Sequence, residues 1–164
     1  MKSGQVQAVD TRNSTMNLVV HNVYTKSLTF EAPNSPSIFS SDWDPRLTFD
    51  MKLSNKVLVE GLYEFVISVS VKVELASIKK SIQQPKETAF IIKVQQAGIF
   101  SPEGLPGGEQ VDDILRRTAP RILFPYIREV VSNIVAKGGF PQLILPPMSF
   151  EEIFLNVPAD TRKD

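Results

Sequence analysis

The sequence predicts an α+β domain in which a four-stranded antiparallel sheet is followed by one long helix and a short C-terminal helix. Two observations predict the sheet: polar and apolar residues alternate in four stretches, and the connections between the last three stretches are short enough for hairpins. A third observation predicts the long helix, because the apolar period lengthens from two residues to between three and four after about residue 111.

The first two strand-like stretches each have one apolar and one polar face. In the second, LTFDMKL, apolar residues at every other position from Leu47 to Leu53 are typical of a sheet with one face in water. In the first, LVVHNVYTKSLTFE, the alternation predicts that Tyr24, Leu28 and Phe30 share the inner face. The same alternation assigns to the outer face Thr25, Ser27, Thr29 and Glu31.

The third and fourth stretches predict the centre of the sheet. YEFVISVSVKVEL places apolar residues inward at every second position from Tyr63 to Leu75, and polar ones, including Glu64, outward. In TAFIIKVQQAGIF the inner positions are Phe90, Ile92 and Val94, and the outer ones are Ile91, Lys93 and Gln95. The basic loop between these stretches, around Lys79 and Lys80, is expected to be mobile.

The helical period runs from about Val111 to Lys137. It predicts one long helix, or two helices broken at Pro120 or Pro125, because an interior proline removes a hydrogen bond and clashes with the preceding turn. Gly138 and Gly139 predict its C-terminal end. A shorter helix is expected to begin at Ser149, with Glu152 completing a capping box.

The composition fits a single domain of ordinary globular character. The 164 residues carry equal numbers of basic and acidic side chains, 18 of each, so nothing favours binding to nucleic acid or to an anionic membrane surface. No apolar run approaches the ~18 residues of a membrane span, so we expect no membrane insertion and a cytoplasmic protein. Polar tails over residues 1–15 and 157–164 are expected to flank a domain over residues 16–156.

Groups able to perform catalysis are scarce in this sequence. Cysteine is absent, and His21, the only histidine, lies within a predicted strand, where a structural role is expected. The acidic pairs Asp112–Asp113 and Glu151–Glu152 fall in the first turns of predicted helices, so helix capping accounts for them. GLPGGEQ lacks the lysine and hydroxyl residue of a phosphate-binding loop. We therefore predict neither an enzyme nor a metal site.

Aromatic and aliphatic residues also gather outside the regular elements, in SIFSSDWDP and GGFPQLILPPMSFEEIF. Such residues either plug the core or form an apolar groove for other chains. Pro141, Pro146 and Pro147 keep the second segment out of a regular helix or sheet. We expect this segment to be a groove wall, with one side packed and the other accessible.

Five segments, in this order, resemble the SecB family of bacterial protein-export chaperones: YTKSLTFEAPNSP, DWDP, ETAFIIKVQQAGIF, ILFPYIRE and GGFPQLILPPMSFEEIF. The resemblance covers roughly Leu18 to Phe154. It implies a Greek-key-like sheet assembled as a homotetramer, a dimer of dimers, without catalysis or cofactor. It also implies an ATP-independent cytosolic chaperone (a holdase) that binds unfolded precursor proteins and delivers them to the SecA translocation ATPase for Sec export.

The resemblance implies apolar contacts with the unfolded substrate from the crossover loop, the long helix and the C-terminal part. Carried over by position, these are Phe39, Trp43, Tyr126, Phe140, Leu143, Leu145, Phe150 and Phe154. Burying apolar side chains stabilises a complex by roughly 25 cal/mol per Å² with little demand for sequence. Each residue also has a structural interpretation, Tyr126 for example as packing between helix and sheet.

The sequence departs from the family on the outer face of the sheet, where the zinc-containing tail of SecA docks on acidic residues. The corresponding positions are Ser27, Glu31 and Lys93, with Ile91 beside them, so one carboxylate is kept, one is neutral and one is reversed. A lysine repels a basic tail, and charges at an interface act mainly on encounter rate and specificity. The holdase role is therefore better supported than the delivery to SecA.

Three functions remain open. The first is a general export chaperone whose SecA contact has been rebuilt. The second is a SecB-like chaperone dedicated to another client, such as an antitoxin, with weak or no SecA binding. The third is a small enzyme or ligand-binding domain on a related scaffold, and the lack of any catalytic constellation counts against it.

Overall fold

The computed structural model describes residues 17–76, 86–104 and 108–150. Within these ranges the chain forms a sheet, a short 3-10 helix and one long α-helix. The elements are β1 (Asn17–Glu31), η1 (Ser37–Ser40), β2 (Pro45–Val59), β3 (Leu62–Leu75), β4 (Glu87–Glu103) and α1 (Glu109–Lys137). We call residues 138–150, which follow α1, the return segment.

The four strands form one antiparallel sheet in the order β1-β4-β3-β2. β2, β3 and β4 are successive neighbours, as the hairpin prediction requires, and β1 lies beside β4 because the chain crosses over from β1 to β2. The turn between β2 and β3 uses Gly61 at φ 77°, a conformation that a side chain would strain. The predicted Greek-key-like, four-stranded architecture with one long helix is confirmed.

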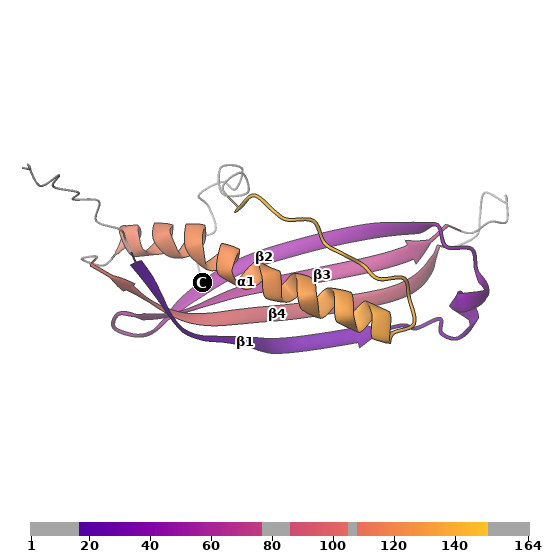
Figure 1. The fold of residues 1–164 in the computed structure, drawn as a ribbon, viewed down its shortest axis with the longest axis horizontal. Coiled ribbons are helices and arrows are strands. Elements are labelled where there is room, and N and C mark those ends of the chain that lie inside the picture. The colour runs from indigo at the N-terminus through magenta and orange to yellow at the C-terminus, as the bar shows by residue number, and fades with distance from the viewer. Residues whose placement is uncertain (1–16, 77–85, 105–107, 151–164) are drawn as a thin grey trace, which may run out of the picture.

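α1 crosses one face of the sheet, which we call the inner face, and leaves the other, outer face uncovered by any helix of the described residues (Figure 1). The helix packs mainly on β4, with smaller contacts to β3 and β1. The alternation predicted for the central strands is confirmed, since Phe90, Ile92 and Val94 are fully buried while Lys93 and Gln95 are exposed. The core therefore lies between α1 and the two central strands.

β1 contains a β-bulge that changes which side chains face the core. Tyr24 pairs with Ala97 and Ser27 pairs with Gln95, so one extra residue stands between them on β1. Ala97 and Gln95 are two residues apart on β4 and share the outer face. Because a bulge adds a residue and reverses the alternation beyond it, Tyr24 and Ser27 also share that face.

The bulge corrects two predictions made from simple alternation. Tyr24 does not share the inner face with Leu28 and Phe30, and Thr25 does not share the outer face with Ser27. The hydroxyl of Thr25 instead donates to Oε1 of the buried Gln96 at 3.0 Å. An uninterrupted period of two has no means of anticipating this extra residue.

α1 is one continuous helix of 29 residues, with Pro120 and Pro125 both inside it. The alternative of two broken helices is therefore wrong. Each proline removes one backbone donor, and buried positions on either side, such as Ala119 and Leu123, hold the helix against the sheet. The helix ends as predicted, with Gly138 at the C-cap and Gly139 at φ 84°.

Several predictions lie outside the described residues. These are the two tails, the basic loop around Lys79 and Lys80, and the short helix expected from Ser149, which would extend beyond Phe150. The acidic pair Glu151–Glu152 and the candidate substrate contact Phe154 are outside as well.

Candidate functional site

Five aromatic rings meet at the end of the sheet where β1 finishes and β2 and β4 begin. Phe140 is at the centre of this cluster. Its ring centroid lies 5.0 Å from that of Phe90, 5.2 Å from Phe39, 6.0 Å from Trp43 and 6.5 Å from Phe30. The crossover loop, the sheet and the return segment thus each supply a ring, and three of the predicted substrate contacts are brought together.

The cluster has a buried centre and an exposed rim. Phe140 is only 6% exposed, whereas Phe39 is 51% and Trp43 is 40% exposed. Ile38, beside Phe39 on η1, is buried and anchors this short helix to the core. Large apolar side chains are normally covered, so two exposed rings packed at a tilt against a fixed base form a surface suited to further apolar contact.

The return segment runs back along α1, on the side of the helix nearer to β2 (Figure 1). Three contacts hold it there. Their partners on α1 lie progressively closer to the start of the helix. The contacts are Gln142 Nε2 to Ser132 Oγ at 2.6 Å, Arg128 Nε to the Leu145 carbonyl at 2.7 Å, and the rings of Phe150 and Phe124 at 5.4 Å. The segment is thereby fixed although it has no regular secondary structure before Phe150.

The two sides of the return segment differ in burial. Leu145 and Phe150 are buried, Leu143 is partly buried against the core, and Ile144 is 66% exposed. Pro141, between the cluster and these residues, is also exposed. This confirms the prediction that one side of the segment is packed and the other accessible.

The inner face of β2 is apolar and only partly covered. Leu47 is exposed, and Phe49, Met51 and Leu53 are partly buried, because α1 lies over the other strands. We call Phe39, Trp43, Leu47 and Ile144 the open apolar surface. Sequence reasoning missed Leu47 and Ile144 as surface residues, since alternation identifies an apolar face and only the position of α1 shows which strand it leaves open.

Tyr126 is not part of this surface. Phe124 and Arg128 face the return segment, and Tyr126 is two positions from each, about 200° around the helix. Its side chain is 49% exposed, and it belongs to a stripe of apolar residues spaced four positions apart whose other members are partly buried. That stripe consists of Ile122, Tyr126, Val130 and Ile134. The structure therefore separates this predicted substrate contact from the others.

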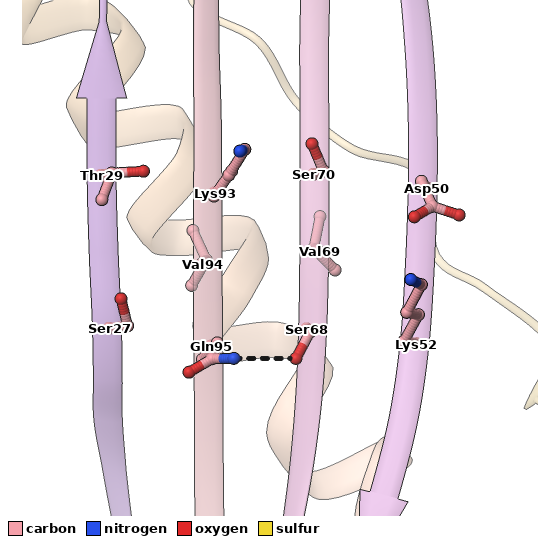
Figure 2. Close-up of a pocket in the computed structure, with 10 residues that line it drawn as sticks. All are labelled: Ser27, Thr29, Asp50, Lys52, Ser68, Val69, Ser70, Lys93, Val94 and Gln95. Atoms are coloured by element: carbon pink, nitrogen blue, oxygen red, sulfur yellow. Dashed lines mark hydrogen bonds between the residues drawn. The ribbon is translucent and has the colours of Figure 1, made fainter.

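The four positions predicted for the SecA contact share the outer face. Glu31 pairs with Ile91, while Thr29 pairs with Lys93 one step along the ladder. Ser27, Glu31 and Lys93 are exposed and Ile91 is partly exposed. A shallow depression of about 290 Å³ lies on this face across all four strands, and Figure 2 shows Ser27 and Lys93 among its lining residues.

Glu64 has the most perturbed carboxyl group of the described residues. It lies on the outer face as predicted, yet it is only 4% exposed, because Tyr24, Lys26 and Lys56 surround it. The Tyr24 hydroxyl donates to Oε1, and the ammonium groups of Lys26 and Lys56 lie 2.9 and 3.2 Å from the carboxylate oxygens. The hydrogen bond from Tyr24 and then that from Lys26 lower the pKa of Glu64 to about 2.

The same hydrogen bond acts in the opposite direction on its donor. Because the Tyr24 hydroxyl donates to a carboxylate, with burial adding to the effect, its pKa is raised to about 12. Tyr24 is therefore neutral and Glu64 charged over the whole neutral range. Glu64 is an ionised carboxylate with three partners. It links strands of the sheet and is not available as a general acid or base.

His21 and Asp112 are also paired, in structural roles. His21 Nε2 lies 2.7 Å from Ser101 Oγ, which is consistent with the structural role predicted for it. Asp112 accepts from Arg116 at 2.6 Å and from Asn55 at 2.7 Å. No side chain caps the N-terminus of α1, so the prediction that Asp112 and Asp113 cap this helix is wrong. Asp112 lies in the first turn, where a carboxylate complements the helix dipole, and the two carboxylates form ion pairs with Arg116 and Arg117.

Residues 17–76, 86–104 and 108–150 contain no group of three acidic, histidine or cysteine side chains placed to hold a metal ion. Within the same ranges no helix has the length and apolar character to cross a membrane.

The chain belongs to a class of molecular chaperones, as a match to a family model shows. More particularly, the chain belongs to the SecB family, because the family model described as preprotein translocase subunit SecB matches residues 11–160. Members of this family are chaperones and not enzymes, which agrees with the sequence analysis.

A solved structure of this kind is the Mycobacterium tuberculosis Rv1957 SecB-like chaperone in complex with a ChAD peptide from the Rv1956 HigA1 antitoxin. It is similar to this chain with a TM-score of 0.63 and 15% sequence identity, over 80% of this chain and 91% of that one. A Streptococcus agalactiae protein of unknown function matches 82% of this chain and 100% of its own at 10% identity, with a TM-score of only 0.34.

Proposed function

We propose that this protein is an ATP-independent holdase of the cytoplasm that binds unfolded precursor polypeptides on the open apolar surface. The observation that carries the proposal is the exposure of Phe39 and Trp43 on a base formed by the buried Phe140. Rings held in place by packing lose little further freedom when they are covered, so apolar contact there is favourable.

Two physical features of this surface suit an unfolded client. Burial of apolar side chains stabilises a complex by roughly 25 cal/mol per Å², so any sufficiently apolar client sequence is able to bind. β2 is in addition an edge strand with a free side, and an extended client is able to add backbone hydrogen bonds at such an edge. Many weak contacts along one client then give avidity while each contact exchanges readily.

The predicted substrate contacts divide into two roles in this proposal. Phe39 and Trp43 touch the client directly. Phe140, Leu145 and Phe150 support the surface from below, since they are buried. Leu143 lies between these groups, being partly buried against the core.

The holdase proposal is tested by light scattering of a chemically unfolded client diluted into buffer with the protein. The Phe39→Ser, Trp43→Ser double variant is expected to lose most of the protection. Val59→Ser, which removes an exposed apolar side chain at the opposite end of β2, serves as the matched control and is expected to protect fully. Equal protection by all three proteins would refute the proposed client surface.

We further propose assembly as a homotetramer, supported by a second apolar area. β1 is the other edge strand of the sheet, and Val20 and Leu28 are exposed on it. Tyr126 is exposed on the side of α1 turned away from the return segment. An unpaired edge next to exposed apolar side chains suits a second copy of this chain. Light scattering coupled to size exclusion should give a tetramer, and Tyr126→Glu should yield smaller species.

For the client's onward route, we propose delivery to the Sec export pathway through SecA. A chaperone dedicated to one client, in the manner of the relative that holds an antitoxin peptide, is favoured instead by the outer face, where Lys93 and Ser27 replace the expected acidity. Calorimetric titration with the C-terminal SecA peptide, with and without zinc, separates the two. Absence of heat from a protein that still protects clients would leave the dedicated chaperone.

A further inference from the structure

The depression on the outer face is built from two rows of side chains that run across the strands. One row contains Thr29, Lys93, Ser70 and Asp50, and the next contains Ser27, Gln95, Ser68 and Lys52. Figure 2 shows these side chains on four adjacent strands, with the helix behind the sheet. Val69 and Val94 complete the lining, which contains no aromatic ring.

Two cations in this depression are without an internal partner. Neither Lys52 nor Lys93 forms an ion pair with another described residue, although Lys26, Lys56 and Lys72 on the same face all do. Within the described part of the chain, the hydroxyls of Ser27, Thr29 and Ser70 likewise form no hydrogen bond, and Ser68 only accepts a long one from Gln95 at 3.4 Å. The depression therefore presents unused hydrogen-bond donors and two unneutralised positive charges.

We propose that this depression docks an extended acidic segment of a partner protein, with two carboxylates placed three or four residues apart. The spacing follows from the sheet. Lys93 and Lys52 are two strands and one row apart, which corresponds to about 12 Å between their Cα atoms, since strands lie about 4.8 Å apart and residues about 3.3 Å. An extended peptide covers that distance in three to four residues.

Asp50 selects a peptide over a polyanion. It stands in the row of Lys93 and two residues before Lys52 on β2, so it repels ligands with charge at every step, such as nucleic acid. A peptide with spaced carboxylates avoids this repulsion and is able to offer Asp50 a backbone or side-chain donor. The absence of stacking residues from the lining also disfavours nucleobases.

The docking surface is independent of the proposed holdase site. The depression lies on the outer face, and Phe39, Trp43 and the return segment lie with α1 on the inner face or at its end. A client and an acidic partner are therefore able to bind at once. The partner's segment is opposite in charge to a basic SecA tail.

The test is fluorescence anisotropy with the full-length protein at low ionic strength. The probe is a labelled glycine- and serine-rich peptide with two glutamates four residues apart. The comparison peptides carry glutamine at both positions, or two adjacent glutamates. We expect the spaced peptide to bind at least about tenfold more tightly than the glutamine peptide, and more tightly than the adjacent one.

Lys93→Glu and Lys52→Glu should each weaken this binding about tenfold while leaving protection of an unfolded client unchanged. Arg117→Glu, the same charge change on the exposed side of α1, is the matched control and should alter binding less than about twofold. The proposal is overturned if Arg117→Glu weakens binding as much as the lysine variants do, if the glutamine peptide binds equally well, or if duplex DNA displaces the peptide more effectively than the unlabelled peptide.

Discussion

The Tyr24 hydroxyl donates a hydrogen bond to Glu64 across an intervening strand, since Tyr24 lies on β1, Glu64 on β3, and β4 runs between them. Lys26, the extra residue of the β1 bulge, and Lys56 on β2 bind the same carboxylate. One buried group thus connects the two edge strands of the sheet through side chains. It does so on the outer face, where no helix of the described residues covers the strands.

Removal of the Tyr24 hydroxyl is expected to destabilise the fold. Tyr24→Phe deletes a hydrogen bond to a charged, nearly buried group, and such bonds are worth about 1.5–3 kcal/mol. Because two lysines remain, we expect a loss of about 1–2 kcal/mol in the free energy of unfolding, measured with urea. Tyr63→Phe is the control, since no hydrogen bond of its hydroxyl is found within the described ranges; equal losses for both variants would contradict the prediction.

The contribution of Glu64 to stability should depend on pH with a defined sign. Its pKa in the folded protein is about 2, below its ordinary value of 4.5. The contribution is therefore fully present above about pH 4.5 and is lost as the pH falls toward 2. Urea unfolding of the protein and of Glu64→Gln should show a difference that shrinks through this range. A difference that is constant from about pH 6 to pH 3 would be the contrary result.

Gly138 should resist substitution because of space and not because of backbone conformation. Its φ of −71° suits any residue, but an added Cβ would overlap the ring of Phe30. We expect Gly138→Ala to lower the free energy of unfolding by about 1–3 kcal/mol, the usual range for overpacking. Adding Phe30→Leu should recover part of that loss in a double-mutant cycle. Strict additivity of the two substitutions would show that the contact is not responsible.

The aromatic cluster should separate stability from client binding. Phe140→Ala removes a buried ring with four aromatic neighbours, so we expect a loss of about 3–5 kcal/mol. Phe39→Ala removes a half-exposed ring and should cost about 1 kcal/mol or less while weakening client protection. Thermal unfolding and the light-scattering assay measure the two effects. A strongly destabilised Phe39→Ala protein would place this ring in the core.

The sequence predicted the elements well because their periods are local. Seven inward positions at a period of two on β3 and a helical period through α1 each reflect burial against one layer, so both elements formed as expected. The hairpins followed from short connections. The two aromatic segments meet in the structure, where Phe39 and Trp43 pack on Phe140, and their role as substrate contacts stays a prediction.

The failures arose where distant parts of the chain decide the outcome. The bulge at Lys26 reversed the faces of Tyr24 and Thr25, and the contacts of Arg128 and Phe124 hold the return segment on a different side of α1 from Tyr126. Glu64 looked like an ordinary outward-facing residue, yet partners from β1 and β2 bury it. None of these contacts joins residues close in sequence, so no local pattern records them.

The sequence by itself thus determined the sheet, the helix, the apolar character of the linking segments and the altered charge of the outer face. Each of these features depends on the spacing or identity of residues that are close together in the chain. Only the tertiary structure decided which apolar residues stay open. α1 lies over β4, β3 and β1 and leaves Leu47 and the rim of Phe39 and Trp43 uncovered. Exposure depends on how one layer is placed over another, and that placement is the sum of contacts between elements far apart in the chain.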